Sequence, residues 1–340
     1  SMQFDALMPF RVKKILIVSS LYDLYNLRED GRLNTLVMAQ YAELRLSRAP
    51  TLKRVDSGLN ALEVLKTNDF DLIIVFRSLT DIESDEFSRE VKSLNPNVPI
   101  VLLAFHHREL ELMREQGCEA FDDIFFWNGE SKMLLTIIKY VEDKKNVKAD
   151  TELVGVRVII LVENSVRFYS SFLPLIYTEI VQQTSALLSE SINSANRLLR
   201  MRARPKILLA ENFEDALSLF HQYKKFLLGV ISDIQFSKDG QIDETAGIQL
   251  AAVIKEEISD LPVLLQSSDD SKAEQADECN ASFLNKRSPT LLNELSTFIN
   301  ENFGFGDFIF RLPDGTEIGR ASNFREMQRA VARIDGRSLI

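Results

Sequence analysis

The chain has 340 residues, of which 45% are hydrophobic, and its formal net charge is −10. This length predicts about two domains, the composition is typical of a globular protein, and the negative charge disfavours general nucleic-acid binding. No apolar run is long enough to cross a bilayer, so we expect neither a membrane segment nor a signal peptide. Only Cys118 and Cys279 are present, which argues against a disulfide framework and predicts a cytoplasmic protein.

Four apolar runs in the first half of the chain are typical of buried parallel strands. They are "KKILIVSS" (13–20), "FDLIIVF" (70–76), "VPIVLLAF" (98–105) and "GCEAFDDIFFWN" (117–128). Their hydrophobicity is continuous rather than alternating, as in strands that are covered on both faces. The amphipathic segment "SKMLLTIIKYVEDK" (131–144) closes this set and is predicted to be a helix.

The same order of segments returns in the second half. The corresponding runs are "RVIILVEN" (157–164), "FLLGVISD" (226–233), "LPVLLQSS" (261–268), "ECNASFLNK" (278–286) and "PTLLNELSTFINENF" (289–303). Strands that alternate with helices predict two doubly wound α/β domains. We place them at residues 9–145 and 155–303. The charged stretch "DKKNVKAD" (143–150) is interpreted as a linker or a helix end, and the linker is set at 146–154.

Polar residues end the apolar runs of the second copy. They are Glu163 with Asn164, Asp233, Ser267 and Lys286. In parallel α/β sheets, reactive groups gather at the carboxyl ends of the strands, so we expect these side chains to lie together. The set contains two acids, an amide, a hydroxyl and an amine, and its members become informative only through their convergence.

This pattern resembles the receiver domain of two-component response regulators over residues 156–303. The resemblance implies a five-stranded parallel sheet of the flavodoxin-like type. It also implies that Asp233 accepts a phosphoryl group from a histidine kinase. Glu163 and Asn164 match the pair of acids that holds Mg²⁺ in this family, and the backbone carbonyl of Gln235 would be a further ligand. Oxygen ligands suit this hard cation, which neutralises charge on the phosphoryl group.

The resemblance also implies a switch. Ser267 matches the family's hydroxyl that meets the phosphoryl oxygens, Phe283 matches the switch aromatic, and Lys286 matches the lysine that pairs first with Asp233 and later with the phosphate. A hydrogen bond from the Ser267 hydroxyl to the phosphate would draw in the following loop and reposition Phe283.

The second copy departs from the family in two places. Asn164 stands where the family has an acid, which predicts weaker Mg²⁺ binding and slower phosphorylation or altered dephosphorylation, or a partly active-like state without phosphate. The stretch "QFSKDGQIDETAG" (235–247) is several residues longer than the family loop. It either reshapes access to Asp233 or is a surface insertion.

The first copy keeps the strands and loses the functional residues. Ser19 and Ser20 replace the paired acids, Phe76 replaces the acceptor, Ala104 replaces the hydroxyl and Trp127 replaces the lysine. We therefore interpret this domain as a degenerate pseudo-receiver that takes no phosphate.

Residues 165–204 occupy the place of the family's short first helix. They contain Pro174 as their single proline and no glycine, and apolar residues recur at helical spacing. A continuous helix of this length would reach roughly 55 Å, which is longer than one small domain. We predict that it packs against the first domain, forms a homodimer with the same helix of a second copy, or does both. The alternative is a core helix of this chain that bends near Pro174.

The C-terminal segment 304–340 is predicted to contain a hairpin in "FIFRLPDGTEIGRA", with its turn at 313–315, and a short helix in "NFREMQRAVARI". Two receivers followed by "FRLPDG" are similar to the front of regulators fused to phosphoenolpyruvate synthase or pyruvate phosphate dikinase-like parts. This similarity implies an effector domain or protein after residue 340.

Two functions from different classes follow. The first is a phosphorylation-controlled response regulator that assists its own phosphotransfer, acts on an effector, and has no metabolic activity in this segment. The second is a docking or dimerisation scaffold made of two silent receivers, which Asn164 favours and which Asp233, Ser267 and Lys286 disfavour. A third hypothesis, an α/β hydrolase or haloacid-type phosphatase that uses Asp233 as a nucleophile, has little support. Such phosphatases need a second acid two residues after the nucleophile, and residue 235 is Gln.

Overall fold

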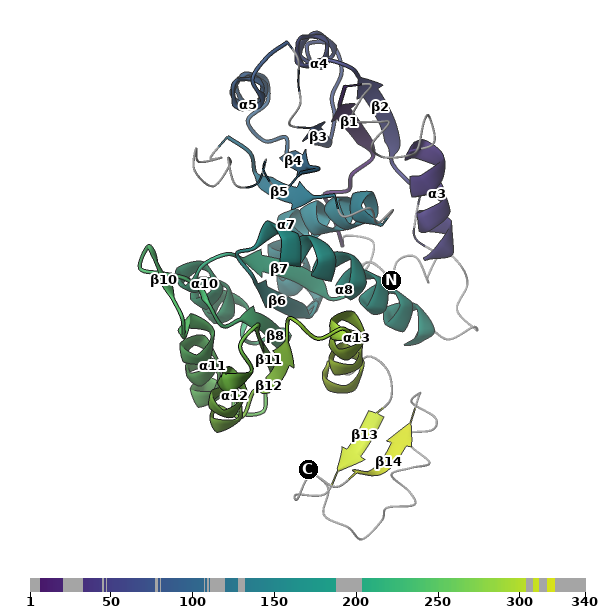
Figure 1. The fold of residues 1–340 in the computed structure, drawn as a ribbon. Helices are drawn as coiled ribbons and strands as arrows, with labels where there is room; N and C mark the ends of the chain where they lie inside the picture. Colours follow the sequence, from purple (N-terminus) through teal and green to yellow (C-terminus); the bar gives the residue numbers. More distant parts are fainter. Residues whose placement is uncertain are drawn as a thin grey trace. The chain divides into compact units, whose positions relative to one another are not determined.

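The structure is a computed structural model that describes most of the chain. The described residues are 7–20, 33–44, 46, 48–76, 79, 81–106, 108, 110, 120–127, 132–187, 204–303, 308–311 and 317–321. The chain divides into two compact units: unit 1 comprises residues 1–150 with 165–174, and unit 2 comprises 151–164 with 175–340 (Figure 1). No helix in the described part is long and apolar enough to cross a membrane.

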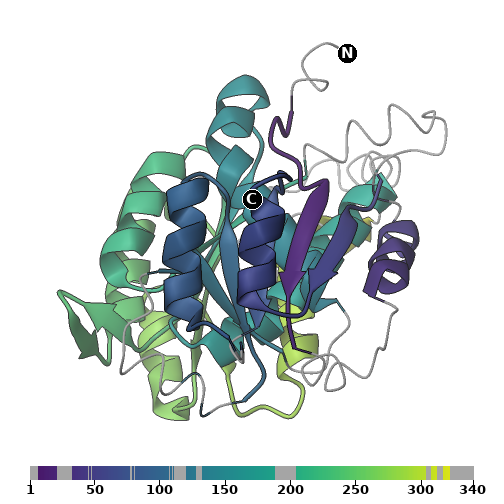
Figure 2. The same ribbon diagram turned by 90° about the horizontal axis from the view of Figure 1, so that it is seen from above.

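Unit 1 is built on a parallel five-stranded sheet with the strand order β2-β1-β3-β4-β5. The strands are β1 (Lys14–Val18), β2 (Thr51–Val55), β3 (Leu72–Phe76), β4 (Ile100–Ala104) and β5 (Asp123–Phe126). The helices are α3 (Leu33–Glu43), α4 (Gly58–Leu65), α5 (Ser84–Leu94) and α7 (Met133–Val154). Helices α4 and α5 cover one face of the sheet (Figure 2).

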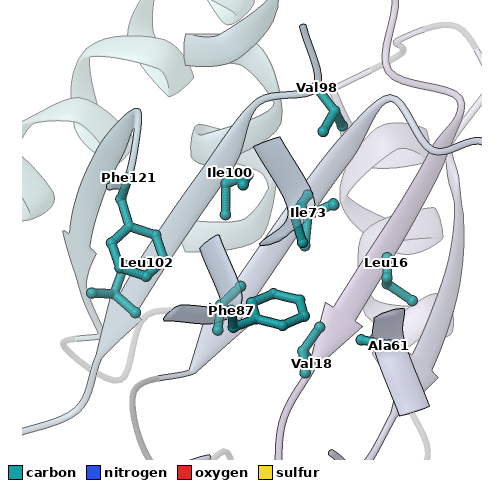
Figure 3. Close-up of a cluster of buried hydrophobic side chains, with 11 residues drawn as sticks. Leu16, Val18, Ala61, Ile73, Phe87, Val98, Ile100, Leu102 and Phe121 are labelled. Carbon is teal, nitrogen blue, oxygen red and sulfur yellow. The ribbon is translucent and has the colours of Figure 1, made fainter. Parts of the chain in front are cut away.

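The core of unit 1 explains why its central strands are apolar throughout. Every residue of β3 and β4 is buried, whereas the edge strand β2 is mostly exposed. On the face that α4 and α5 cover, Phe87 and Ala61 of these helices pack against strand residues such as Val18 and Ile73 (Figure 3). A strand between two helical layers has no polar face, so its hydrophobicity does not alternate.

Unit 2 repeats this architecture with the strand order β12-β11-β8-β6-β7. The strands are β6 (Val158–Val162), β7 (Lys206–Ala210), β8 (Leu227–Asp233), β11 (Val263–Ser267) and β12 (Ser282–Asn285). The helices are α10 (Phe213–Tyr223), α11 (Ala246–Glu257), α12 (Ala273–Glu278) and α13 (Leu291–Asn302), with the short 3₁₀ helix η1 (Asp270–Lys272). Helix α8 (Val166–Leu187) is shared, since its residues up to Pro174 belong to unit 1 and the rest to unit 2. Helix α13 lies on one face of this sheet and α10 and α11 on the other (Figure 1).

Counted along each unit, both sheets have the strand order 2-1-3-4-5, which is the flavodoxin-like order. The prediction of two doubly wound five-stranded parallel sheets is therefore confirmed. In this order the chain reverses its winding direction after the first strand, which leaves a crevice at the carboxyl ends of the first and third strands.

The predicted linker at 146–154 is helical in the structure, because α7 continues to Val154. Side chains one turn apart on this helix bind the extended N-terminal backbone. Asn146 accepts a hydrogen bond from the Phe10 backbone N–H (2.9 Å) and donates one to its carbonyl (2.7 Å). Asp150 accepts the backbone N–H of Met8 at 2.9 Å. Asn146 and Asp150, two of the polar residues in this stretch, are therefore buried and bind backbone groups.

The predicted long helix is described over its first half only, as α8. Residues 188–203 lie outside the described part of the chain. One face of α8 is buried, and its buried apolar side chains are Tyr169, Phe172, Leu173, Ile176, Tyr177, Ile180 and Val181. Pro174 lies inside the helix. The apolar stripe of this half is thus buried within the chain itself.

The insertion after the third strand of unit 2 forms a small antiparallel hairpin, β9 (Phe236–Lys238) and β10 (Gln241–Asp243). Asp239 and Gly240 form its turn with φ values of 51° and 76°, as in the type I′ turns that suit two-residue hairpins. The backbone N–H of Asp239 donates to Glu214 of α10 at 2.9 Å. At the other end, a hydrogen bond from the Thr245 backbone lowers the pKa of Asp243. The insertion is therefore an ordered element rather than a loose loop.

The hairpin predicted in the C-terminal segment is present as β13 (Phe308–Arg311) and β14 (Glu317–Ala321). Its turn at 313–315 and the predicted helix in 323–334 lie outside the described residues.

Candidate functional site

One lysine and two acids meet at the carboxyl end of the unit 2 sheet. The ammonium nitrogen of Lys286 lies 2.6 Å from Oε2 of Glu163 and 2.9 Å from Oδ2 of Asp233. The other oxygen of Asp233, Oδ1, accepts the backbone N–H of Ile234 at 2.8 Å. We call Glu163, Asp233 and Lys286 the acid–lysine triad.

The sheet register brings these three side chains together. Strand β8 lies between β6 and β11, and β12 follows β11. Val162 pairs with Ser232, so Glu163 follows β6 at the level where Asp233 ends β8. The backbone N–H of Lys286 extends the β11–β12 ladder by donating to the Ser267 carbonyl at 2.8 Å. Each member is thus either the last residue of its strand or the first residue after it.

The side chains of the acid–lysine triad are largely shielded from solvent. The exposed fraction of the side chain is 1% for Glu163, 4% for Lys286 and 12% for Asp233. Two carboxylates around one ammonium leave a formal charge of −1 in a buried setting. Such a group is stable only while the opposite charges remain in contact, because an unpaired buried ion is strongly destabilising. Asp233 is the member that is most accessible to solvent.

The other predicted residues lie at or near the same strand ends and differ in how far they are buried. Asn164 is half-buried and directly follows Glu163, and Gln235 is exposed. The half-buried Ser267 ends β11, and its Oγ accepts the backbone N–H of Asp269 at 3.1 Å. Phe283 lies on β12, pairs with Leu265 and is half-buried. Among the predicted residues, only the triad is joined by direct ion pairs.

The loop that starts at Ser267 is held by local hydrogen bonds. Asp269 accepts the hydroxyl of Ser271 at 2.7 Å and its backbone N–H at 3.0 Å. The hydroxyl hydrogen bond is the main reason why the pKa of Asp269 is lowered. The Ser267 oxygen thus serves as an acceptor, and its O–H remains available as a donor.

The oxygen atoms of the site suit a hard divalent cation. Mg²⁺ is held in proteins by one or two carboxylates together with waters and substrate phosphates. Glu163 and Asp233 supply the carboxylates, and Asn164 supplies an amide oxygen beside them. In the described residues, no three or more acidic, His or Cys side chains cluster around a point that suits a metal ion. These residues therefore fit Mg²⁺ in the type of their donor atoms, with one neutral amide among the carboxylates.

Sequence reasoning missed two residues that define the site. Gly247, in the first turn of α11, donates its N–H to the Ile234 carbonyl at 2.9 Å. A Cβ at this position would lie 2.1 Å from the backbone oxygen of Asp233, so only glycine allows this approach. The second is Gln266, which is 1% exposed and pairs in register with Asp233. Its signal in the sequence is a single amide inside the apolar run 261–268.

In unit 1 the corresponding strand ends carry aromatic rings. Phe76 ends β3 where Asp233 ends β8, and it is 1% exposed. Its ring stacks on Phe105 with centroids 5.0 Å apart, and Phe105 in turn lies 6.4 Å from Trp127. This aromatic cluster occupies the positions that match the acceptor and the lysine.

The remaining unit 1 counterparts are also uncharged. Ser19 is fully buried beyond β1, Ser20 follows it, and Ala104 is fully buried at the end of β4. None of the five matched positions has a carboxylate or an amine.

Comparisons with known proteins were made by sequence and by structure. No protein-family model and no curated protein matches the sequence. A solved structure described as a putative two-component system response regulator/GGDEF domain protein is 18% identical, with a TM-score of 0.35. The match covers 85% of this chain and 98% of that chain.

Two single-domain structures match about two fifths of the chain. One is the signal receiver domain of an HD domain-containing protein from Pseudomonas fluorescens, with 16% identity, a TM-score of 0.32, and coverage of 42% of this chain and 94% of that chain. The other is the receiver domain of a sensor histidine kinase from Pseudomonas aeruginosa with a magnesium ion in its active-site cleft. It has 19% identity, a TM-score of 0.29, and coverage of 38% and 95%. These values carry no argument about function.

Replacing Gly247 by Ala tests whether α11 fixes the acceptor strand end. We expect Gly247→Ala to lower the free energy of unfolding by about 1–3 kcal/mol, because the added methyl overpacks against backbone atoms. It should also shift the amide NMR resonances of Asp233 and Ile234. Gly240→Ala controls for the resonances only: no atom lies within 4 Å of its added Cβ, so it should leave Asp233 and Ile234 unshifted, although its φ of 76° makes it destabilising as well. Unmoved resonances in Gly247→Ala would contradict the close approach.

Proposed function

We propose that the chain is a two-component response regulator in which unit 2 is the phosphorylatable receiver. The observation that carries this proposal is the acid–lysine triad: an accessible Asp233 held beside a buried lysine at the carboxyl end of the third strand. The flavodoxin-like order supports it, because that edge of the sheet is where ligands bind in this fold. The phosphoryl donor would be a histidine kinase.

The proposed reaction is a transfer of one phosphoryl group. An oxygen of Asp233 forms a bond to phosphorus while the bond between phosphorus and the donor's imidazole nitrogen breaks, and that nitrogen keeps the electron pair. Lys286 already contacts Asp233, so its ammonium is in place to stabilise the charge on the transferring oxygens. Glu163 holds the ammonium from the other side.

Mg²⁺ would neutralise charge on the phosphoryl oxygens when it is bound. Glu163, Asn164, Asp233 and the backbone carbonyl of Gln235 would hold it. The neutral amide of Asn164 makes the set one charge poorer than a pair of acids with Asp233, so we propose weak metal binding that strengthens when phosphate adds its oxygens.

Ser267 and Phe283 are proposed to carry the signal. The Ser267 hydroxyl has a free donor position, and it would donate to the new phosphate, which pulls on the loop that Asp269 anchors. Phe283 lies two strands from Asp233 and would follow this movement. The changed surface around Ser267 and Phe283 would control an effector. This effector would be a partner protein or a domain attached through the C-terminal segment after residue 303.

Unit 1 is proposed to be a pseudo-receiver that serves as a structural or docking part. Its aromatic cluster of Phe76, Phe105 and Trp127 supports this role, since aromatic rings offer neither a nucleophile nor metal ligands. The similarity of the C-terminal segment to regulators fused to phosphoenolpyruvate synthase-like parts stays a prediction.

Intact-mass measurement after incubation with Mg²⁺ and acetyl phosphate tests the proposed acceptor. We expect one phosphoryl addition in the wild type and none in Asp233→Asn, because the amide is not a nucleophile. Asp239→Asn, a neighbouring change of the same kind in the exposed hairpin turn, should retain the addition. If the wild type takes up no phosphoryl group, the chain is a scaffold of two silent receivers and the proposal fails.

Restoring the missing acid tests the role of Asn164. We expect Asn164→Asp to lower the Mg²⁺ concentration needed for half-maximal phosphorylation by about tenfold, which corresponds to about 1.4 kcal/mol of added attraction. Asn293→Asp adds the same charge on the exposed side of α13 and should change nothing. An unchanged Mg²⁺ dependence in Asn164→Asp would show that residue 164 is not a metal ligand.

We further propose that a homodimer forms through the helix predicted at 165–204. Because the described half buries its apolar face within the chain, the contact would use residues 188–204. Sedimentation equilibrium at micromolar concentration should give a dimer for the wild type and a monomer for Leu198→Asp. Asn196→Asp introduces the same charge at a polar position and should stay dimeric. A monomeric wild type would refute the dimer.

A further inference from the structure

Gln266 is a buried amide that lacks a partner for its donor group. It is 1% exposed, and its Nε2 donates no hydrogen bond to any of the described residues. A buried donor without a partner costs about 1–3 kcal/mol, and in native structures such groups usually have a role. The backbone of Gln266 is satisfied by contrast, since its carbonyl accepts the Ile234 N–H at 3.0 Å.

The register places Gln266 on the same face of the sheet as the triad. It pairs with Asp233 on β8 and with Leu284 on β12, and paired residues of parallel strands point to the same face. Lys286 lies two residues beyond Leu284 and therefore shares that face. Glu163 stands at the level of Asp233 on the opposite side of β8. Gln266 and Glu163 thus flank Asp233 from its two neighbouring strands.

Phosphorylation of Asp233 would change the charges around the buried Glu163 carboxylate. Its carboxylate is 1% exposed and is held by the ammonium of Lys286 at 2.6 Å. Phosphorylation replaces the single negative charge of the Asp233 carboxylate by nearly two on the phosphoryl oxygens, so about one negative charge is added toward solvent, and this charge attracts the ammonium. Movement of Lys286 toward the phosphate weakens its contact with Glu163, and a buried carboxylate that loses its cation is strongly destabilised.

We propose that Gln266 is a positioning residue that donates a hydrogen bond to Glu163 when Lys286 moves to the phosphoryl group. Neighbouring strands lie about 4.8 Å apart, so the backbones of Gln266 and Glu163 are about 10 Å apart. Two side chains of this length span that distance. The unpaired amide then has its partner in the phosphorylated state, and its cost in the unphosphorylated state favours the switch. This inference rests on the proposed phosphorylation of Asp233.

A double-mutant cycle tests the inference without phosphate. Lys286→Met removes the ammonium, so the buried Glu163 carboxylate loses its cation, as it would when Lys286 moves to the phosphoryl group. In the wild-type background, Gln266→Leu should raise the melting temperature by about 2–4 °C, because it removes the unpaired amide. In the Lys286→Met background, Gln266→Leu should lower the melting temperature instead, because Glu163 loses its replacement donor. A role in packing alone gives the same sign in both backgrounds and would overturn the proposal.

Two controls make this sign change specific. Thr184→Val removes another buried polar atom without a partner among the described residues, far along α8, and should have the same effect in both backgrounds. Adding Glu163→Gln to Lys286→Met removes the buried charge, so Gln266→Leu should again be stabilising. If the Lys286→Met chains do not fold, Lys286→Gln replaces it; this side chain is one atom shorter than Lys and keeps a neutral N–H donor, so a smaller change of the same sign is expected.

A second measurement uses phosphate itself. At limiting acetyl phosphate, the phosphorylated fraction of Gln266→Leu should fall about tenfold below that of the wild type, which is the loss expected for one charge-assisted hydrogen bond. An equal fraction would overturn the role of Gln266. A wild type that takes up no phosphoryl group would overturn the proposed function instead, and the cycle with Lys286→Met would still decide whether Gln266 supports Glu163.

Discussion

The contact of one ammonium with two buried carboxylates is the constraint on which the functional end of unit 2 depends. Lys286 touches both Glu163 and Asp233, and all three side chains are largely withdrawn from water. Neither acid tolerates this burial alone, because desolvation of a carboxylate costs several kcal/mol. The strands β6, β8 and β12 must therefore end at one level, which the parallel register and the 2-1-3-4-5 order provide.

The fold was predictable because its signals are strong and occur twice. Continuous apolar runs such as 70–76 and 226–233 become strands that are covered on both faces, and the repeated order of segments predicts two similar sheets. Of the two interpretations of the stretch 143–150, a linker or a helix end, the structure shows the helix end, and the sequence left the choice open for a physical reason. Asn146 and Asp150 are polar, and sequence alone does not distinguish a solvated polar residue from a buried one that binds backbone groups.

The site was predictable where the chemistry lies at strand ends and not where it depends on packing. Asp233, Glu163 and Lys286 follow apolar runs directly, so their convergence follows from the topology. Gly247 is important because of its distance from the Asp233 backbone, and that distance is set by how α11 crosses the sheet. The position of Gln266 beside Asp233 follows from the register, which a strand's own sequence does not reveal.

The two units show which substitutions the triad allows. Removing only the lysine would leave two buried carboxylates without compensation, so a site of this kind is lost as a whole. Unit 1 agrees, because Phe76 and Trp127 replace the acceptor and the lysine together, and the buried Ser19 replaces the first acid. Asn164 differs, since it stands outside the ion pairs of Lys286. Its neutral amide leaves unchanged the charge balance that holds Asp233 in place.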